Sequence, residues 1–414
     1  MKNIIVVGGG ASGLMAAYVA ARQGANVTLL EKMTTLGRKL MITGKGRCNI
    51  TNIASIPDII KNMPGNGSFL YSALNQFTNQ DITHFLRDYG VDTKIERGGR
   101  VFPVSDKAID VVEAFGRALE ECKVVIYYNE SVKSIKVDGG KIIGVITKQG
   151  KEYSADAVIL ATGGASYPGT GSSGDGYSIV QALGHTIIPV KPSLIPLEVE
   201  EEWVKDLQGL SLKNVEACIV MQNKEVASEF GEMLFTHYGL SGPIILSLSK
   251  TVTQLMASHP DKEILVRINL KPAISQETLD KRIQRDFQTF VRKQLKNALD
   301  ELLPQKLIPI IIDLAYLDPD KPVHQISKTE RNRIVQQISH LTFTISGTRP
   351  IAEAIVTAGG ISVKEINAKT MESKIIEGLY FAGEVIDIDG YTGGYNLQAA
   401  FSTGYVAGLN AASD

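Results

Sequence analysis

The feature that most constrains the fold is a glycine motif of the form G-x-G-x-x-G at residues 8–13. It follows an apolar run, residues 3–7, that is typical of a buried parallel strand, and it opens a predicted helix over 12–23. A second predicted strand, 26–31, ends in Glu31. Strand, helix and strand within about thirty residues form one βαβ unit. The combination predicts a Rossmann-type dinucleotide site.

Each part of this motif has a physical role. Gly8 allows the tight turn, Gly10 lets the backbone approach a pyrophosphate, and Gly13 lets helix and strand pack closely. Free N–H groups and a partial positive charge at the helix start attract phosphate. Glu31 can accept hydrogen bonds from both hydroxyls of a ribose. The alternative, a glycine-rich turn followed by a surface glutamate, would not require these elements in this order.

Three later segments favour FAD over NAD as the dinucleotide. Residues 158–164 resemble the strand-to-glycine motif that lies near the dinucleotide in flavoproteins, and residues 379–384 end a strand with Glu384, which could hold a ribitol hydroxyl. Residues 393–397 begin a helix that could face N1 and the C2 carbonyl of a flavin, where negative charge collects on reduction.

Another G-x-G-x-x-G, residues 169–174, lies well beyond its preceding strand, and no acid ends a following strand about twenty residues later. We therefore predict no second nucleotide-binding domain.

Composition and charge narrow the possible partners. The 414 residues suggest two or three domains. Lysine plus arginine total 43 against 44 acidic residues, which argues against a partner that is nucleic acid or an anionic membrane. Cys48, Cys122 and Cys218 are far apart and form no C-x-x-C, so a dithiol flavin reductase is not expected. No apolar run is long enough for a signal peptide or membrane span, and we expect a cytoplasmic protein.

The pattern changes from about residue 190. Before it we expect mostly loop over 32–70, then helices at 78–89 and 106–121 and strands near 123–127, 131–137, 141–147 and 157–161. Runs at 194–199, 215–221 and 263–270 predict a small β domain. Apolar residues from Leu279 to Leu295 predict one long amphipathic helix, and Ser327 with Glu330 forms a capping box ahead of another. The apolar pattern of a buried strand returns at 378–384, and the pattern of residues 396–410 predicts a final helix.

Five longer motifs resemble those of a bacterial flavoprotein family that includes aminoacetone oxidase and bile-acid-type enone reductases, within the glutathione-reductase-type FAD superfamily. They are Gly37–Leu40, Thr43–Asn49, Gly171–Tyr177, Gly239–Pro243 and Gly390–Asn396. The resemblance runs along essentially the whole chain. It implies an α/β fold with a split Rossmann-type FAD-binding domain (1–190 and 345–414), a β-barrel-like insert (191–270 and 341–344) and a helical cap (271–340). It does not fix the substrate, because one fold can host many reactions.

Non-covalent FAD is the expected cofactor, since no flavin-linking motif stands out, and no metal site is expected. The family's loop corresponding to residues 32–47 lies along the FAD, so some of its cations would neutralise the pyrophosphate or line the flavin. For Lys32 and Lys39 a solvated position is preferred. Cys48 could be a flavin neighbour or a reactive thiol, whereas a lone cysteine in a glycine loop is more often passive. The predicted cofactor-binding residues are Gly8, Gly10, Ala11, Ser12, Gly13, Glu31, Lys32, Arg38, Lys39, Gly44, Gly46, Arg47, Cys48, Val132, Ala161, Thr162, Gly163, Gly164, Gly383, Glu384, Gly394, Asn396 and Leu397.

The candidate catalytic residues lie outside the nucleotide motifs. Residues 235–243 are the most conspicuous such segment, and Pro243 suits the first turn of a helix, capped by Ser241 or Gly242. His237 or Tyr238 could act over the flavin as an acid, a base or a substrate anchor. The alternative, a packed turn between barrel and helix, is the better supported of the two. Tyr391 and Tyr395, close to the flavin-facing glycines, are rival candidates.

These features predict an FAD-dependent oxidoreductase that transfers a hydride between a small organic substrate and flavin N5. The lack of a second nucleotide domain favours an oxidase of a small amine or aminoketone. The alternative is a reductase of a conjugated ketone, with NAD(P)H as a transient co-substrate. A flavin-dependent RNA-modifying protein, suggested by the basic loop, and a non-catalytic flavin sensor are hypotheses of other classes. The near-neutral total charge speaks against nucleic acid as a partner, and the oligomeric state cannot be read from the sequence.

Overall fold

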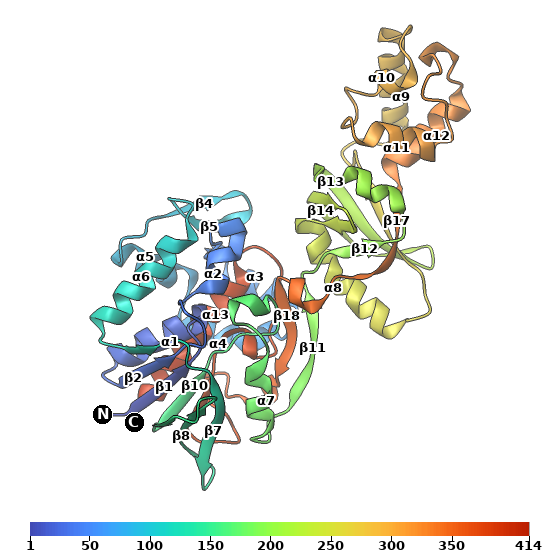
Figure 1. The fold of residues 1–414 in the computed structure, drawn as a ribbon. Coiled ribbons are helices and arrows are strands. Elements are labelled where there is room, and N and C mark those ends of the chain that lie inside the picture. Colours follow the sequence, from blue (N-terminus) through green and yellow to red (C-terminus); the bar gives the residue numbers. More distant parts are fainter. Residues whose placement is uncertain (414) are drawn as a thin grey trace. The chain divides into compact units, whose positions relative to one another are not determined.

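The computed structural model describes residues 1–413 and divides into two compact units (Figure 1). Unit 1 contains residues 1–193 and the chain from Ile351 onward, and unit 2 contains residues 194–350. Each unit has its own hydrophobic core. Among the described residues, no helix combines the length and apolar character that crossing a bilayer requires.

Unit 1 is built on a five-stranded parallel sheet in the order β19-β10-β1-β2-β6. The strands are β1 (Asn3–Val7), β2 (Asn26–Leu30), β6 (Val125–Tyr127), β10 (Ala157–Leu160) and β19 (Leu379–Phe381). Every residue of β10 and β19 is buried, and only Asn3 of β1 is exposed. Strands covered on both faces consist of nearly continuous apolar residues, which is why these segments are so apolar. The predicted α/β fold with a split Rossmann-type sheet is confirmed.

The register of this sheet aligns the strand ends that carry the glycine motifs. Leu30, Val7, Leu160 and Phe381 lie in one row across four neighbouring strands. The residues that follow them therefore leave the sheet at the same edge. In open α/β sheets ligands bind at this carboxyl edge of the strands. The fold thus brings together segments that are far apart in the sequence.

Three helices of unit 1 pack against one another: α1 (Ala11–Arg22), α6 (Ala108–Glu121) and α13 (Tyr395–Ala412). The contact between α1 and α13 is close because of two glycines. A Cβ added to Gly404 would lie 2.3 Å from the Ser12 carbonyl oxygen, and one added to Gly408 would lie 2.4 Å from that of Ala16. Because the contact advances four residues along each helix, α1 and α13 run in the same direction.

The remainder of unit 1 consists of short elements. They are α2 (Arg38–Ile42), β3 (Thr51–Asn52), α3 (Ile56–Lys61), α4 (Tyr71–Gln76), α5 (Asn79–Asp88), β4 (Thr93–Glu96), β5 (Arg100–Pro103), β7 (Val132–Asp138), β8 (Lys141–Thr147), β9 (Glu152–Ser154), α7 (Asp175–Gln181), β11 (Ile187–Ser193) and β18 (Val356–Ile361). They form antiparallel sheets β3-β5-β4, β7-β8-β9 and β11-β18. The prediction of mostly loop over 32–70 missed α2 and α3, which are too short to show a helical period.

Unit 2 contains a closed antiparallel barrel in the order β12-β15-β14-β13-β16-β17. Its strands are β12 (Leu197–Val199), β13 (Ser211–Met221), β14 (Lys224–Thr236), β15 (Gly239–Ser241), β16 (Ile264–Asn269) and β17 (Leu341–Thr348). The helices are α8 (Pro243–Ser258), α9 (Gln276–Thr289), α10 (Leu295–Ala298), α11 (Leu307–Leu314) and α12 (Lys328–Ser339). Closure leaves this sheet without an exposed edge.

The helical segment confirms one prediction and corrects another. Ser327 and Glu330 form the expected capping box at the start of α12. The predicted long helix from Leu279 to Leu295 is wrong at its end, because α9 stops at Thr289 and Leu295 begins α10. Val291 between them is 47% exposed. The apolar spacing continued across a turn and so imitated one helix. Pro243 opens α8 as expected, and Gly242 precedes it as the cap.

Candidate cofactor site

The turn between β1 and α1 has the geometry of a dinucleotide site. Gly8 has a φ of 104°, and a Cβ there would lie 2.6 Å from the Ala161 carbonyl oxygen. A Cβ on Gly13 would lie 1.9 Å from the Gly8 carbonyl oxygen, whereas one on Gly10 would meet no atom within 4 Å. Gly8 and Gly13 are therefore required by the packing of the protein, and Gly10 faces open space that a phosphate could approach. The first turn of α1 carries no acidic residue and no side-chain cap, so its N–H groups suit an anion.

Glu31 lies beside this turn and is held in a fixed orientation. Its side chain is 8% exposed, and its two oxygens accept hydrogen bonds from the N–H groups of Gly9 and Met33, each at 2.7 Å. A carboxylate oxygen can accept a second hydrogen bond, so capacity for two ribose hydroxyls remains. The buried Val132 begins β7 nearby, since the Glu130 N–H donates to the Glu31 carbonyl oxygen at 2.9 Å.

The Gly171–Tyr177 motif lies next to the same carboxyl edge of the parallel sheet. Thr162 Oγ1 and Asp175 Oδ1 are both buried and have no hydrogen-bond partner. A Cβ on Gly176 would lie 2.1 Å from Thr162 Oγ1, so this motif packs directly against the end of β10. A buried polar atom left unsatisfied costs roughly 1–3 kcal/mol. Two such atoms beside the Gly8–Gly13 turn fit the polar groups of a bound dinucleotide.

The expectation that Lys32 and Lys39 are solvated is wrong. Lys32 pairs with Asp175 at 2.8 Å, and Lys39 pairs with Glu384 at 2.7 Å. The two lysine side chains are only 22% and 23% exposed. Sequence patterns missed these pairs because the partners are 143 and 345 residues away along the chain.

Glu384 lies at the carboxyl end of β19, where the sequence placed it, within a hydrogen-bonded network. Its Oε1 accepts the Thr357 N–H at 2.7 Å and the Ser166 hydroxyl at 3.1 Å, while Lys39 Nζ donates to Ser166 Oγ at 2.6 Å. A Cβ on the neighbouring Gly164 would lie 3.0 Å from Glu384 Oε1. The network therefore joins the ends of β10 and β19.

The turn before α13 is held by asparagine side chains. Asn396 accepts the Gly390 N–H at 2.8 Å and donates to the carbonyl oxygens of Gly390 and Tyr391 at 2.9 and 3.2 Å. Its amide thus supports the turn from within. A Cβ on Gly394, whose φ is 99°, would lie 2.3 Å from the Thr51 carbonyl oxygen. Only a glycine can therefore occupy this position without displacing β3, and the half-buried Leu397 follows in the first turn.

Asn52 is a further residue of this turn that sequence reasoning missed. It is 3% exposed, and its Nδ2 donates to the carbonyl oxygens of both Gly98 and Gly393, at 2.9 and 3.0 Å. It lies just beyond the Thr43–Asn49 motif, which was the one available signal. Through Asn52, the β3-β5-β4 sheet and the start of α13 form one hydrogen-bonded assembly.

The starts of α1 and α13 are staggered by a ligand-sized distance. The contact between Ser12 and Gly404 is one residue into α1 but nine residues into α13. At 1.5 Å per residue, α13 therefore begins about 12 Å before α1 along their common direction. Both helices direct their positive ends the same way. This spacing suits the two ends of one dinucleotide.

The remaining predicted residues of the basic loop differ in their surroundings. Arg47 pairs with Asp106 at 2.6 Å and with Glu96, and its guanidinium lies 4.2 Å from the centre of the Phe102 ring. Arg38 is half-buried, and no side chain within residues 1–413 forms an ion pair with it. Cys48 is fully buried, which raises the pKa of its thiol to about 12. Its burial and raised pKa are those of an unreactive thiol, its place beside the flavin stays a prediction, and Gly44 and Gly46 supply left-handed turns around it.

The candidate catalytic residues have structural contacts of their own. In unit 2, His237 is exposed with its ring 4.8 Å from that of Tyr238, and Arg349 lies 4.6 Å above the Tyr238 ring. In unit 1, the Tyr391 N–H donates to the Asn62 carbonyl oxygen at 2.9 Å, and burial raises the pKa of Tyr395. Catalytic roles for these residues stay predictions.

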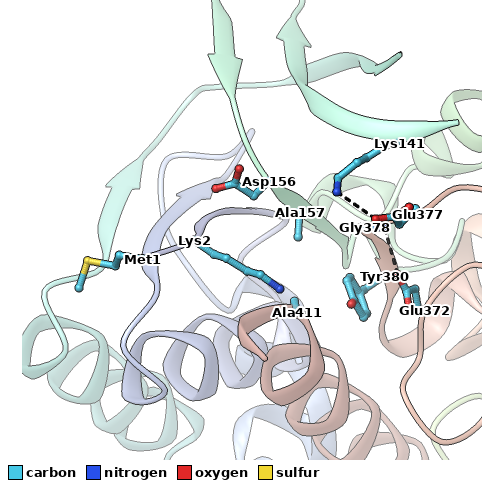
Figure 2. A pocket seen from close by; sticks show the side chains of 10 residues that line it. All are labelled: Met1, Lys2, Lys141, Asp156, Ala157, Glu372, Glu377, Gly378, Tyr380 and Ala411. Carbon is cyan, nitrogen blue, oxygen red and sulfur yellow. Dashed lines mark hydrogen bonds and ion pairs between the residues drawn. The ribbon is translucent and has the colours of Figure 1, made fainter. Parts of the chain in front are cut away.

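A cavity of about 350 Å³ lies elsewhere in unit 1 (Figure 2). Lys2, Asp156 and Gly378 line it, and they directly precede β1, β10 and β19 of the parallel sheet. The cavity is therefore at the amino edge of the sheet. Since ligands of such sheets bind at the carboxyl edge, it is not the cofactor site.

Comparison with known proteins identifies the family. The sequence profile described as "HI0933-like protein Rossmann domain" matches residues 2–410. The chain belongs to the HI0933-like family. This HI0933-like protein is 33% identical over 414 residues to a 3-dehydro-bile acid delta(4,6)-reductase of Clostridium scindens. The alignment covers 100% of this chain and 99% of that relative. It is 32% identical over 410 residues to a ribosomal RNA dihydrouridine synthase of Haemophilus influenzae, covering 98% and 97%. A protein of the same name from Escherichia coli is 30% identical, covering 97% and 96%.

Solved structures show the same fold at lower identity. A 3-ketosteroid-delta4-(5alpha)-dehydrogenase from Rhodococcus jostii is similar with a TM-score of 0.53 and 16% identity, covering 100% of this chain and 97% of that one. A 3-ketosteroid delta1-dehydrogenase from Sterolibacterium denitrificans gives a TM-score of 0.55 and 13% identity, covering all of both chains. Family and fold together make this HI0933-like protein an FAD-binding oxidoreductase.

Proposed function

We propose that this HI0933-like protein reduces a carbon–carbon double bond conjugated to a carbonyl group, with NAD(P)H as the source of electrons. The observation that carries the proposal is a shared chemistry among whole-length relatives of similar identity. One is named for reducing double bonds of a 3-dehydro bile acid, and two are named for making dihydrouridine. In an enone and in uracil alike, the double bond reduced lies next to a carbonyl group. The amine oxidase reading has less support from these relatives.

The residues of the site fit FAD and would bind its parts separately. The N–H groups of the Gly8–Gly13 turn would hold the pyrophosphate, and Glu31 would hold the adenosine ribose. Thr162, whose buried hydroxyl has no partner, and Glu384 would bind polar groups between the pyrophosphate and the flavin ring. When bound and reduced by NAD(P)H, FAD would supply a hydride to the electron-poor carbon of the double bond, and a proton would be added to the other carbon. The start of α13 would stabilise the negative charge that accompanies reduction.

Two substrate classes are candidates. Uridine in RNA is the first, because relatives from two organisms are named ribosomal RNA dihydrouridine synthase. A steroid-type enone is the second, because the 33% identical relative carries that name. The expectation that nucleic acid is not a partner rested on total charge, which does not report local charge.

Anaerobic turnover tests the proposal. The flavin would first be reduced with NADH or NADPH, and then either a ribosomal RNA transcript or a steroid enone would be added. We expect the absorbance of oxidised flavin to return with one of them, and mass spectrometry to show a product carrying two added hydrogens. Flavin that is reduced by amines, and that neither double-bond substrate re-oxidises, would instead establish an oxidase and reject the proposal.

A further inference from the structure

A group of basic side chains lies beside the start of α13. The 3-10 turn Arg97–Gly99 connects β4 to β5, and Asn52 ties its Gly98 carbonyl to that of Gly393 in the turn before α13. The wall formed by β3, β5 and β4 is therefore adjacent to the part of the site assigned to the flavin. Charges on this wall act close to the reacting end of the cofactor site.

The wall carries more positive than negative charge. Lys94, Glu96, Arg97 and Arg100 belong to its strands and turn, Arg47 and Asp106 join it through ion pairs, and Lys45 follows Gly44, whose added Cβ would lie 3.2 Å from the Phe102 ring. We call these seven charged residues the basic rim. The chain as a whole has a formal net charge of −1. The rim is thus a local departure from a near-neutral protein.

Both carboxylates of the rim are already engaged by two of its cations. Arg47 binds Glu96 and Asp106, and Lys94 binds Asp106 at 2.5 Å. These hydrogen bonds lower the pKa of both carboxyl groups, so both are ionised at neutral pH. The two carboxylates offset two of the five cations, so the rim keeps a formal net charge of +3. The three cations outside these ion pairs are Lys45, Arg97 and Arg100, and of these Arg100 lies opposite Glu96 in the register of β4 and β5 and also lowers the pKa of that carboxyl group.

Those three cations, Lys45, Arg97 and Arg100, form no ion pair within the described part of the chain. The Arg100 Nε donates to the Arg97 carbonyl oxygen at 3.0 Å, and its guanidinium lies 5.8 Å from the centre of the Phe102 ring. Arg47 lies over the same ring. Two guanidinium groups therefore lie against one ring, so an anion bound by Arg100 would also be close to the charge of Arg47.

Apolar side chains are exposed on the same wall. Ile95 on β4 is 62% exposed, and Ile53, which follows β3, is 55% exposed. A Cβ on Gly99 would lie 3.0 Å from Ile53, so this residue borders the Arg97–Gly99 turn directly. The surface thus combines an excess of positive charge with exposed apolar side chains, and this combination suits a large organic anion.

We propose that Lys45, Arg97 and Arg100 bind an oxyanion group of the substrate outside the flavin end of the site. The inference rests on the proposed function and adds which part of the substrate is recognised. The oxyanion is either a phosphate of RNA or the carboxylate of an amphipathic acid. Cationic side chains bind both groups by charge-assisted hydrogen bonds.

The test compares Arg97→Gln/Arg100→Gln with the control Lys133→Gln/Lys148→Gln. Both control lysines are exposed, form no ion pair within the described residues and lie on or just after strands β7 and β8. The two double variants lose the same charge. Binding would be measured on the oxidised holoenzyme, by anisotropy with a labelled ribosomal RNA transcript and by flavin quenching with a carboxylate steroid enone and its methyl ester.

We expect the rim variant alone to bind one ligand roughly tenfold more weakly. For RNA, the slope of log affinity against log salt would also fall in magnitude by about 0.7–0.9 per lost phosphate contact. For the acid, the difference between the acid and its ester would disappear. Equal binding by both variants to both ligands would overturn the proposal. So would a rim effect found only in the binding of NADP+, titrated on the same oxidised holoenzyme, because the anion would then belong to the reductant. Binding is read without turnover, so a failure of the proposed reaction is separately visible.

Discussion

Glu31 is the residue whose removal acts most directly on the cofactor. Its carboxylate is fixed by two backbone N–H groups and retains acceptor capacity. We expect Glu31→Ala to weaken FAD binding about tenfold or more, because charge-assisted hydrogen bonds are lost. Glu31→Gln keeps a neutral acceptor and should give an intermediate loss. Flavin fluorescence on dilution measures the release, and a fully yellow Glu31→Ala protein with unchanged retention would remove this assignment.

The reactivity of Cys48 in the basic loop is a second test at the scale of single residues. Burial raises the pKa of its thiol to about 12, so at pH 8 the thiol is protonated and unreactive. The thiolate fraction grows only as the pH approaches 12. We expect iodoacetamide at pH 8 to leave Cys48 unmodified in the folded protein and to modify it after unfolding, as peptide mass spectrometry would show. Rapid labelling of the folded protein would mean that Cys48 is accessible and activated.

The contact between α1 and α13 is the feature to test at the scale of elements. Gly408→Ala would place a Cβ 2.4 Å from the Ala16 carbonyl oxygen, so the helices must separate. We expect the free energy of unfolding to fall by about 1–3 kcal/mol, with weaker FAD retention. Gly116→Ala in α6 is the matched control, since a Cβ there meets nothing within 4 Å. It should be neutral or stabilising by about 0.5–1 kcal/mol. Equal denaturation midpoints for both variants would contradict the close contact.

Elements with a strong local signal were predictable from the sequence. The Gly8–Gly13 turn between two apolar strands and the Ser327–Glu330 capping box each depend on neighbours within a few residues. Strands β14 and β17 were not predicted, because β14 has many exposed and polar residues and β17 pairs with β12 and β16, which are distant in the sequence. The pairing of Lys39 with Glu384 and the Asn52 contacts likewise depend on tertiary structure. Residue types alone could not show that Asn396 supports its own turn.

At the scale of the whole molecule, the attachment of the cofactor is testable. The proposed site would hold FAD by hydrogen bonds and helix starts, and the buried Cys48 thiol is protonated and so is not available to link a flavin. We expect the purified protein to be yellow and acid precipitation to leave the flavin in the supernatant. A yellow pellet that keeps its colour after washing would show a covalent link.

The central claim is that two staggered helix starts in unit 1 bind the pyrophosphate and the isoalloxazine ring of one FAD. A crystal structure of the protein saturated with FAD tests it directly. The account predicts one FAD per chain, with its pyrophosphate at residues 8–13 and its isoalloxazine ring beside residues 393–397. A flavin ring bound away from the start of α13, or two separate nucleotides at the two helix starts, would contradict it.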